Sequence, residues 1–148
     1  MVEQIYPYVQ IVHLICAIIF LGYIFFDVVI FSRLKSALGA DFERVKKAIG
    51  SRAIKIMPVC LFMLIITGGM MMSRWVGSAN GGYFGTPLQK IFMLKVTLAL
   101  IIAVCVAINL SCRAMGRPAP EFLRANIHKI ALTFGFIIVL CAKLMFVV

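Results

Sequence analysis

The chain has 148 residues, of which 64% are apolar and only 14% are charged, and its mean hydropathy is +1.08. Soluble domains contain roughly 45–50% apolar and roughly 25% charged residues, so this composition disfavours a soluble enzyme, a disordered segment and a nucleic-acid-binding module. The 15 basic against 5 acidic residues give a net charge of +10, and basic residues in a membrane protein set the orientation of its helices.

Four segments are long and apolar enough to cross a bilayer, which takes roughly 20 residues in a helix. They cover about residues 8–31, 54–72, 91–110 and 127–148. Because backbone groups in lipid must be hydrogen-bonded within their own segment, each segment is predicted to be an α-helix. The sequence therefore predicts an all-α integral membrane four-helix bundle that forms a single domain over residues 1–148.

The connections between these spans differ sharply in basic residues. The connection between the second and third spans holds only Arg74 and Lys90, whereas the other two are rich in Arg and Lys: Arg33, Lys35, Arg44, Lys46, Lys47, Arg52 and Lys55 in the first, and Arg113, Arg117, Arg124 and Lys129 in the last. The positive-inside rule places the basic loops in the cytoplasm and both termini outside, in the inner (cytoplasmic) membrane. The positive charge is then explained by topology and the lipid bilayer, and no nucleic-acid partner is expected.

Two connections carry further signals. In the first, Leu38, Phe42, Val45 and Ile49 recur at helical spacing, which predicts a short amphipathic helix on the membrane surface. The Gly-, Asn- and Pro-rich segment 78–87 predicts turns. The cysteines all fall in or at the ends of spans without a Cys-x-x-Cys pair, and we interpret them as small apolar packing residues: Cys16, Cys60, Cys105, Cys112 and Cys141.

Polar residues inside the apolar spans are the candidates for function, because burying an ionisable group in lipid is costly. His13 and Lys95 are each followed fourteen residues later by a second polar residue, Asp27 and Asn109. That spacing is about four helical turns, or about 21 Å, so each helix carries its two polar residues on one stripe. With the expected topology, His13, Lys95 and Lys143 form an outer layer, and an inner layer holds Asp27, Asn109 and His128. The two histidines then lie near opposite faces, which disfavours one haem iron bound by both.

Each of these residues also has a structural interpretation. His13 could hydrogen-bond a neighbouring helix, and Lys95 and Lys143 could extend to the outer headgroups. Asp27 could pair with a basic loop residue, and His128 could belong to the inner interface. Beside the outer layer lie Met70, Met71, Met72 and Met93, whose thioethers suit Cu(I). The preceding Gly68 and Gly69 would let a helix, or a flat macrocycle, approach closely.

A set of short motifs resembles a known group of membrane proteins. The second span runs from Ile56-Met57-Pro58 to Thr67-Gly68-Gly69, the third contains Leu94-Lys95, and an early His13 and a late Lys143 complete the pattern. This pattern resembles the small four-helix group that joins HemJ-type protoporphyrinogen oxidases and CopD-type copper-resistance domains. Residues 22–27 and the lead-in to Lys95 differ from the HemJ pattern, and Gly85-Thr86-Pro87 is more similar to the CopD type.

The HemJ resemblance implies a membrane redox protein that binds b-type haem, possessing a haem-dependent oxidoreductase activity in which His13 and Lys95 are essential. His13 would be the proximal iron ligand, and Lys95 either the opposite ligand or a partner for carboxylates of a substrate or of haem. The resemblance also implies a porphyrin substrate or a quinone acceptor. Residues that could contact the cofactor are the rim cations and the glycine pair, namely Arg74, Lys90, Lys143, Gly68 and Gly69.

Two alternatives stay open at this point. The CopD resemblance implies a copper-handling protein that moves Cu(I) at the outer face through His13, Met71, Met72 and Met93. The second alternative is a non-catalytic membrane subunit. This alternative predicts that His13 and Lys95 can be replaced by apolar residues without loss of function. A homodimer that buries apolar faces is compatible with all three hypotheses.

Overall fold

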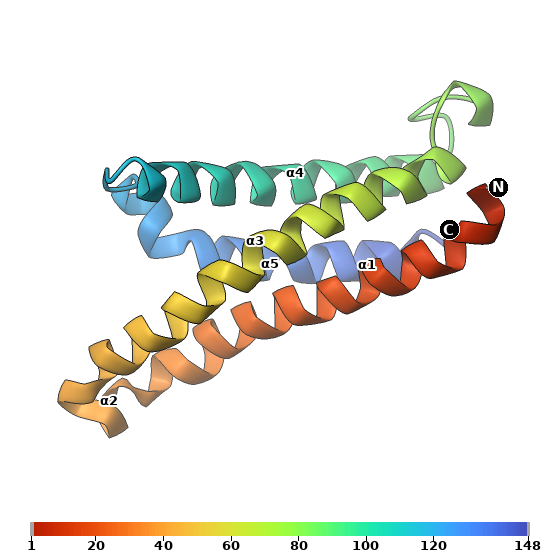
Figure 1. Ribbon diagram of the computed structural model, residues 1–148. Helices are drawn as coiled ribbons and strands as arrows, with labels where there is room; N and C mark the ends of the chain where they lie inside the picture. The colour runs from red at the N-terminus through yellow and green to blue at the C-terminus, as the bar shows by residue number, and fades with distance from the viewer. Residues whose placement is uncertain (1, 148) are drawn as a thin grey trace. The chain divides into compact units, whose positions relative to one another are not determined.

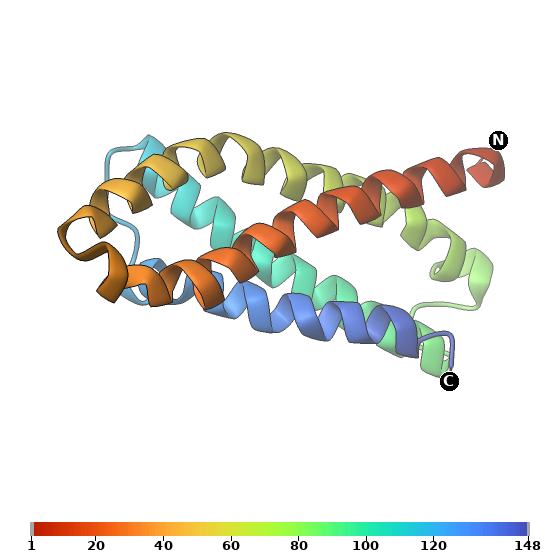
Figure 2. The ribbon, with the colours of Figure 1, turned by 90° about the horizontal axis from the view of Figure 1, so that it is seen from below.

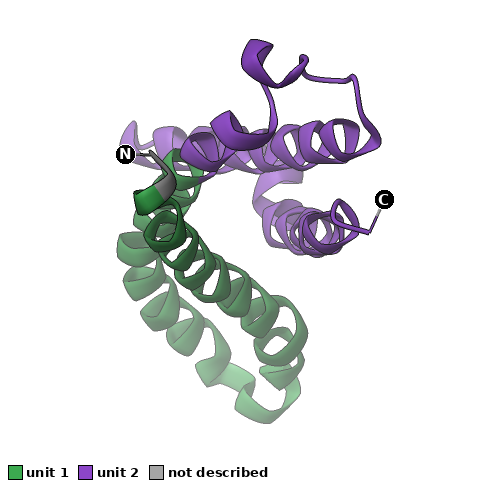
Figure 3. Cartoon of the chain, turned by 90° about the vertical axis from the view of Figure 1, so that its right-hand side faces the viewer, with its two compact units in different colours: residues 1–67 green, residues 68–148 purple. Residues whose placement is uncertain are grey.

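The computed structural model describes residues 2–147, which form helices joined by short turns (Figure 1). The prediction of an all-α fold is confirmed: the described range contains no β-strand, only an isolated antiparallel bridge between Gly77 and Gly82. The chain divides into two compact units, residues up to 67 and residues from 68 onward (Figure 3).

The first unit is a pair of helices joined by a helical reversal, as Figures 1 and 2 show. Its elements are α1 (Val2–Phe25), the π-helix η1 (Phe26–Ile30), the 3₁₀-helix η2 (Phe31–Leu34), α2 (Lys35–Leu38), the 3₁₀-helix η3 (Gly39–Asp41) and the first part of α3 (Phe42–Trp75). The chain reverses at Gly39, whose φ of 51° is accessible to glycine at little steric cost.

Aromatic packing closes this reversal. Phe31 and Phe42 are buried, and their rings stack with centroids 4.9 Å apart. Phe26 lies against Phe31 at 6.1 Å. Because aromatic pairs contribute about 0.5–1.5 kcal/mol beyond their buried area, this cluster joins the end of α1 to the start of α3. The ion pair between Arg44 and Asp41, at 3.2 Å, is exposed to solvent and adds little to the stability of the reversal.

The amphipathic segment predicted on the membrane surface is helical but is not a separate helix. Phe42, Val45 and Ile49 lie in the first turns of α3, which continues without a break to Trp75. No proline or capping residue separates the two stretches, and Gly50 lies within the helix. The prediction of a distinct surface helix is therefore wrong, because helix propagation needs only one new hydrogen bond per added residue.

The second unit is built on two antiparallel helices, α4 (Pro87–Ala114) and α5 (Glu121–Leu144), which pack against each other (Figures 1 and 2). The buried residues of α5 follow helical spacing along one stripe: Leu123, Ile127, Ala131, Gly135 and Cys141. A second apolar cluster of Val76, Phe92 and Met145 closes one end of the unit, where Trp75 meets Phe146 edge-on at 5.5 Å.

Gln89 fixes the loop that precedes α4. Its side chain is 3% exposed; its Oε1 accepts hydrogen bonds from the amides of Gly85 (2.8 Å) and Thr86 (3.3 Å), and its Nε2 donates to the carbonyl of Asn80 (2.8 Å). The Thr86 hydroxyl accepts from the Gln89 amide at 3.2 Å, which completes a capping box. The predicted turn segment is thus held by one buried amide, and Tyr83 and Phe84 at its surface are exposed.

Three helical stretches are long and apolar enough to cross a membrane, which indicates a membrane protein: Gln4–Trp75, Pro87–Ala114 and Glu121–Leu144. The stretch Gln4–Trp75 contains both of the spans predicted in this part of the sequence, about residues 8–31 and 54–72, because helical structure continues through the reversal. The count of four crossings remains a prediction. The last predicted span extends too far, since α5 ends at Leu144. Met1 and Val148, the ends of the predicted domain, lie outside the described residues.

We expect replacement of Gln89 by Leu to lower the thermal unfolding temperature of the detergent-solubilised protein. The change removes three hydrogen bonds and leaves buried backbone groups without partners, which costs about 1–3 kcal/mol. Thr97→Val is the matched control, because the exposed Thr97 hydroxyl bonds only to Met93 of its own helix. Equal unfolding temperatures for the two variants would contradict the role of Gln89.

Candidate functional site

His13 makes a hydrogen bond between helices. Its Nδ1 lies 2.8 Å from the Thr67 hydroxyl, which joins α1 to α3 within the first unit. Thr67 is 4% exposed, and its hydroxyl also donates to the carbonyl of Met63 at 2.6 Å, one turn earlier in α3. The structural interpretation of His13, a bond to a neighbouring helix, is therefore confirmed, and the partner is Thr67.

The hydrogen positions in this chain follow from the number of donors. A threonine hydroxyl has a single hydrogen, and the short bond to Met63 uses it. Thr67 must then accept a hydrogen bond from Nδ1–H of His13. When the imidazole is neutral, this hydrogen bond places its proton on Nδ1, which is the tautomer of a metal-binding histidine whose other ring nitrogen donates to an oxygen.

Lys95 lies in the second unit, on α4, and is half-buried there. Its ammonium group is 3.8 Å from the sulfur of Met145 and 5.0 Å from the centre of the Phe92 ring. Within residues 2–147 no carboxylate forms an ion pair with it. A thioether and a ring face are weak partners for a cation.

The remaining predicted residues have simpler surroundings. Lys90 and Lys143 are exposed, and Arg74, also exposed, places its guanidinium 5.8 Å from the centre of the Trp75 ring. Asp27 lies half-buried in η1, a π-helix, which is a helix type often found at functional positions. The other polar residues of the predicted inner layer, Asn109 and His128, are half-buried on α4 and α5.

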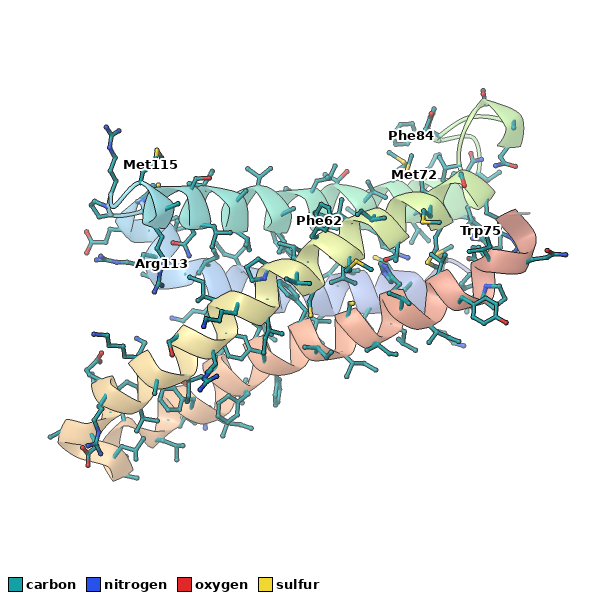
Figure 4. The ribbon with its side chains drawn as sticks, in the orientation of Figure 1. Phe62, Met72, Trp75, Phe84, Arg113 and Met115 are labelled. Atoms are coloured by element: carbon teal, nitrogen blue, oxygen red, sulfur yellow. The ribbon has the colours of Figure 1, made fainter. Side chains whose placement is uncertain are left out.

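The glycine and methionine candidates lie along the last turns of α3 and on α4. Gly69 is exposed, and a Cβ added there would meet no atom within 4 Å, so this side of α3 is open. Met72 and Met93 pack against the apolar cluster of Val76, Phe92 and Met145. Figure 4 shows Met72 near Trp75 at the end of α3. These two thioethers therefore have an ordinary packing role.

The predicted outer layer is divided between the two units, with His13 in the first and Lys95 in the second. Within the units, the structure brings His13 to Thr67 and Lys95 to Met145. The sequence analysis assigned no role to Thr67 or to Met145. Thr67 carried a usable signal, since a hydroxyl in an apolar helix must find an acceptor, whereas Met145 is one of nine methionines and had none.

The chain matches no family model, no curated protein and no solved structure.

We expect Lys95→Met to leave the thermal unfolding temperature in detergent unchanged or to raise it. The substitution removes a half-buried charge whose neighbours are a thioether and a ring, and it keeps most of the side-chain volume. The exposed Lys143→Met serves as the control. A fall of more than about 4 °C, equivalent to roughly 1 kcal/mol or more, would reveal a strong ionic partner and contradict this description.

Proposed function

We propose that this protein is an integral membrane redox protein that binds b-type haem, with His13 as an iron ligand through Nε2. The observation that carries the proposal is the hydrogen-bond chain from His13 through Thr67 to the carbonyl of Met63. This chain fixes the tautomer and the orientation of the ring, and such support raises the basicity of a ligating imidazole. The resemblance to HemJ-type oxidases supports the same function.

In this proposal, His13 binds the iron and the basic residues bind anionic groups. The imidazole of His13 offers a nitrogen donor, which suits iron. Lys95 has no carboxylate partner among the described residues, so we propose that it binds an anionic group of the substrate, such as a porphyrin carboxylate. Exposed Arg74, Lys90 and Lys143 supply further positive charge for carboxylates.

Bound haem would supply one-electron chemistry, and its potential would depend on the ligand, on burial and on nearby hydrogen bonds. The apolar helices would exclude water from the ligand nitrogen, and Thr67 would hold the proton on Nδ1. A membrane-soluble quinone is the electron acceptor that this setting favours, because it partitions into the same apolar phase as the helices.

We further propose that the chain crosses the inner membrane four times with both termini outside. Within the second unit the two ends of α4 support this polarity. Arg113 and Met115 lie at the end opposite to the loop that carries Phe84 (Figure 4). Basic residues favour the cytoplasmic side, and aromatic residues favour the interfaces.

The haem proposal predicts a Soret band in the absorption spectrum of the protein purified in detergent with haem supplied during expression. His13→Ala should abolish the band, because the imidazole is the proposed ligand. Thr67→Val should weaken haem binding by about 10–100-fold, as expected when the partner of a ligating histidine is lost. Thr67→Ser keeps the hydroxyl and should retain binding.

His128 provides the matched control, since it is the only other histidine in the chain. His128→Ala should leave the Soret band unchanged. Wild-type protein without a Soret band, or a band that survives in His13→Ala, would overturn the assignment. Copper that is lost when Met71 and Met72 are replaced by Leu, in protein free of haem, would favour the copper-handling alternative instead.

The topology proposal predicts the behaviour of reporters fused to the chain in bacterial cells. A phosphatase that is active only outside the cytoplasm should be active at either terminus, and a fluorescent protein that folds only in the cytoplasm should be dark there. Fusions after Arg117, in the predicted inner loop, should give the opposite result. Fluorescence at either terminus would contradict the proposed orientation.

A further inference from the structure

Two neighbouring aromatic side chains are exposed in the loop that joins α3 to α4. Tyr83 is 47% exposed and Phe84 is 62% exposed. Figure 4 shows Phe84 on this loop, outside the helices. We call residues 76–86 the aromatic loop. The haem proposal uses neither ring, so their exposure calls for a separate explanation.

The backbone of the aromatic loop is held by hydrogen bonds along its length. The amide of Gly77 donates to the carbonyl of Gly82 at 3.0 Å, and the amide of Gly82 donates to the carbonyl of Gly77 at 2.9 Å. The Gln89 side chain bonds to the Asn80 carbonyl and to the Gly85 amide, each at 2.8 Å. Because these bonds already order the loop, a binding partner does not have to offset the entropy of ordering it. The two rings therefore form a preformed surface.

The aromatic loop lies where the apolar helices end. Helix α3 ends at Trp75 and α4 begins at Pro87, and both helices belong to stretches long enough to cross a membrane. In Figures 1 and 3 the loop projects sideways from the start of α4 instead of continuing along the axis of that helix. Since a spanning helix runs across the bilayer, a sideways projection at its end points along the membrane surface. The exposed rings are then placed at the boundary between hydrocarbon and headgroups.

The chemistry of this surface matches that boundary. A tyrosine ring is apolar with a polar hydroxyl at one end, and such rings are enriched at membrane interfaces. Exposed Arg74 and Lys90 flank the loop in the sequence, and their positive charge complements the phosphates of lipid headgroups. The surface therefore offers apolar area to the acyl chains and positive charge to the headgroups.

A second copy of the chain fits this surface less well. Residues 44–120 contain no Asp or Glu. A symmetric contact through the loop would therefore place Arg74 and Lys90 against the same cations of the other copy. We propose that the aromatic loop is a membrane-interface anchor, in which Tyr83 and Phe84 insert between phospholipid headgroups.

The anchor sets the depth of α4 in the bilayer. Lys95 lies eight residues after Pro87, the first residue of α4, which is about 12 Å along a helix. A loop fixed at the interface thereby keeps Lys95 at a constant depth below the headgroups. This inference depends on insertion into a membrane, but it depends neither on haem binding nor on which end of the helix faces the cytoplasm.

The test places a fluorescent reporter on the loop in phospholipid vesicles. Trp75→Phe removes the only tryptophan and keeps an aromatic ring beside Phe146, and Phe84→Trp then adds the reporter. Its fluorescence should fall more with lipids brominated near the headgroup than with lipids brominated near the chain end, and aqueous iodide should quench it weakly. Each loss is measured against vesicles without bromine, so that quenching by a bound cofactor cancels.

Phe62→Trp in the same Trp75→Phe background is the matched control. Phe62 is also 62% exposed but lies within the apolar part of α3, so the lipids brominated near the chain end should quench it more. Strong iodide quenching of the Phe84→Trp reporter without quenching by brominated lipid would overturn the inference. Quenching by neither agent, as expected when a protein covers the loop, would also overturn it.

A second measurement uses the wild-type protein. Cleavage after Arg74 and Lys90 releases the whole aromatic loop in one tryptic peptide, residues 75–90. A phospholipid that carries a photoreactive diazirine near its headgroup should form adducts with Tyr83 and Phe84, as located by fragment mass spectra. Adducts on other peptides but none on residues 83 and 84 would contradict the anchor. Neither result bears on the Soret band, so failure of this inference is distinguishable from failure of the haem proposal.

Discussion

The requirement that every polar side chain find a partner within an apolar helix pair governs this molecule. A buried hydroxyl or amide without a hydrogen bond costs about 1–3 kcal/mol. The chain has few polar side chains that could supply the missing hydrogen bond. In the part of the chain that the structure describes, no buried side-chain nitrogen or oxygen lacks a hydrogen-bond partner. Among the described residues, the buried polar side chains are those of Thr67 and Gln89, and each is held by hydrogen bonds to at least two other residues.

This requirement links stability to chemistry in the first unit. The hydroxyl of Thr67 satisfies a carbonyl of its own helix and at the same time orients the imidazole of a second helix. A residue that only filled space could not fix the tautomer of His13.

The second unit satisfies the requirement differently. Gln89 replaces the missing backbone partners at the start of α4 and organises a glycine-rich loop. Lys95, by contrast, is supported by a sulfur and a ring, which hold its ammonium group weakly. A charge maintained in weak surroundings is costly for stability.

The sequence alone determined the fold class and the helical segments, because hydropathy and helix length follow directly from residue order. It also identified His13 and Lys95 as exceptional, since ionisable residues are rare in apolar helices. It failed at the amphipathic segment before residue 54, where periodicity could not show that the helix continues into α3. Only the tertiary structure decided which residues of α1 and α3 contact each other, among them His13 and Thr67. Those contacts depend on how α1 and α3 face each other after the reversal at Gly39, and a one-dimensional pattern contains no information about which side chains of two helices come within hydrogen-bonding distance.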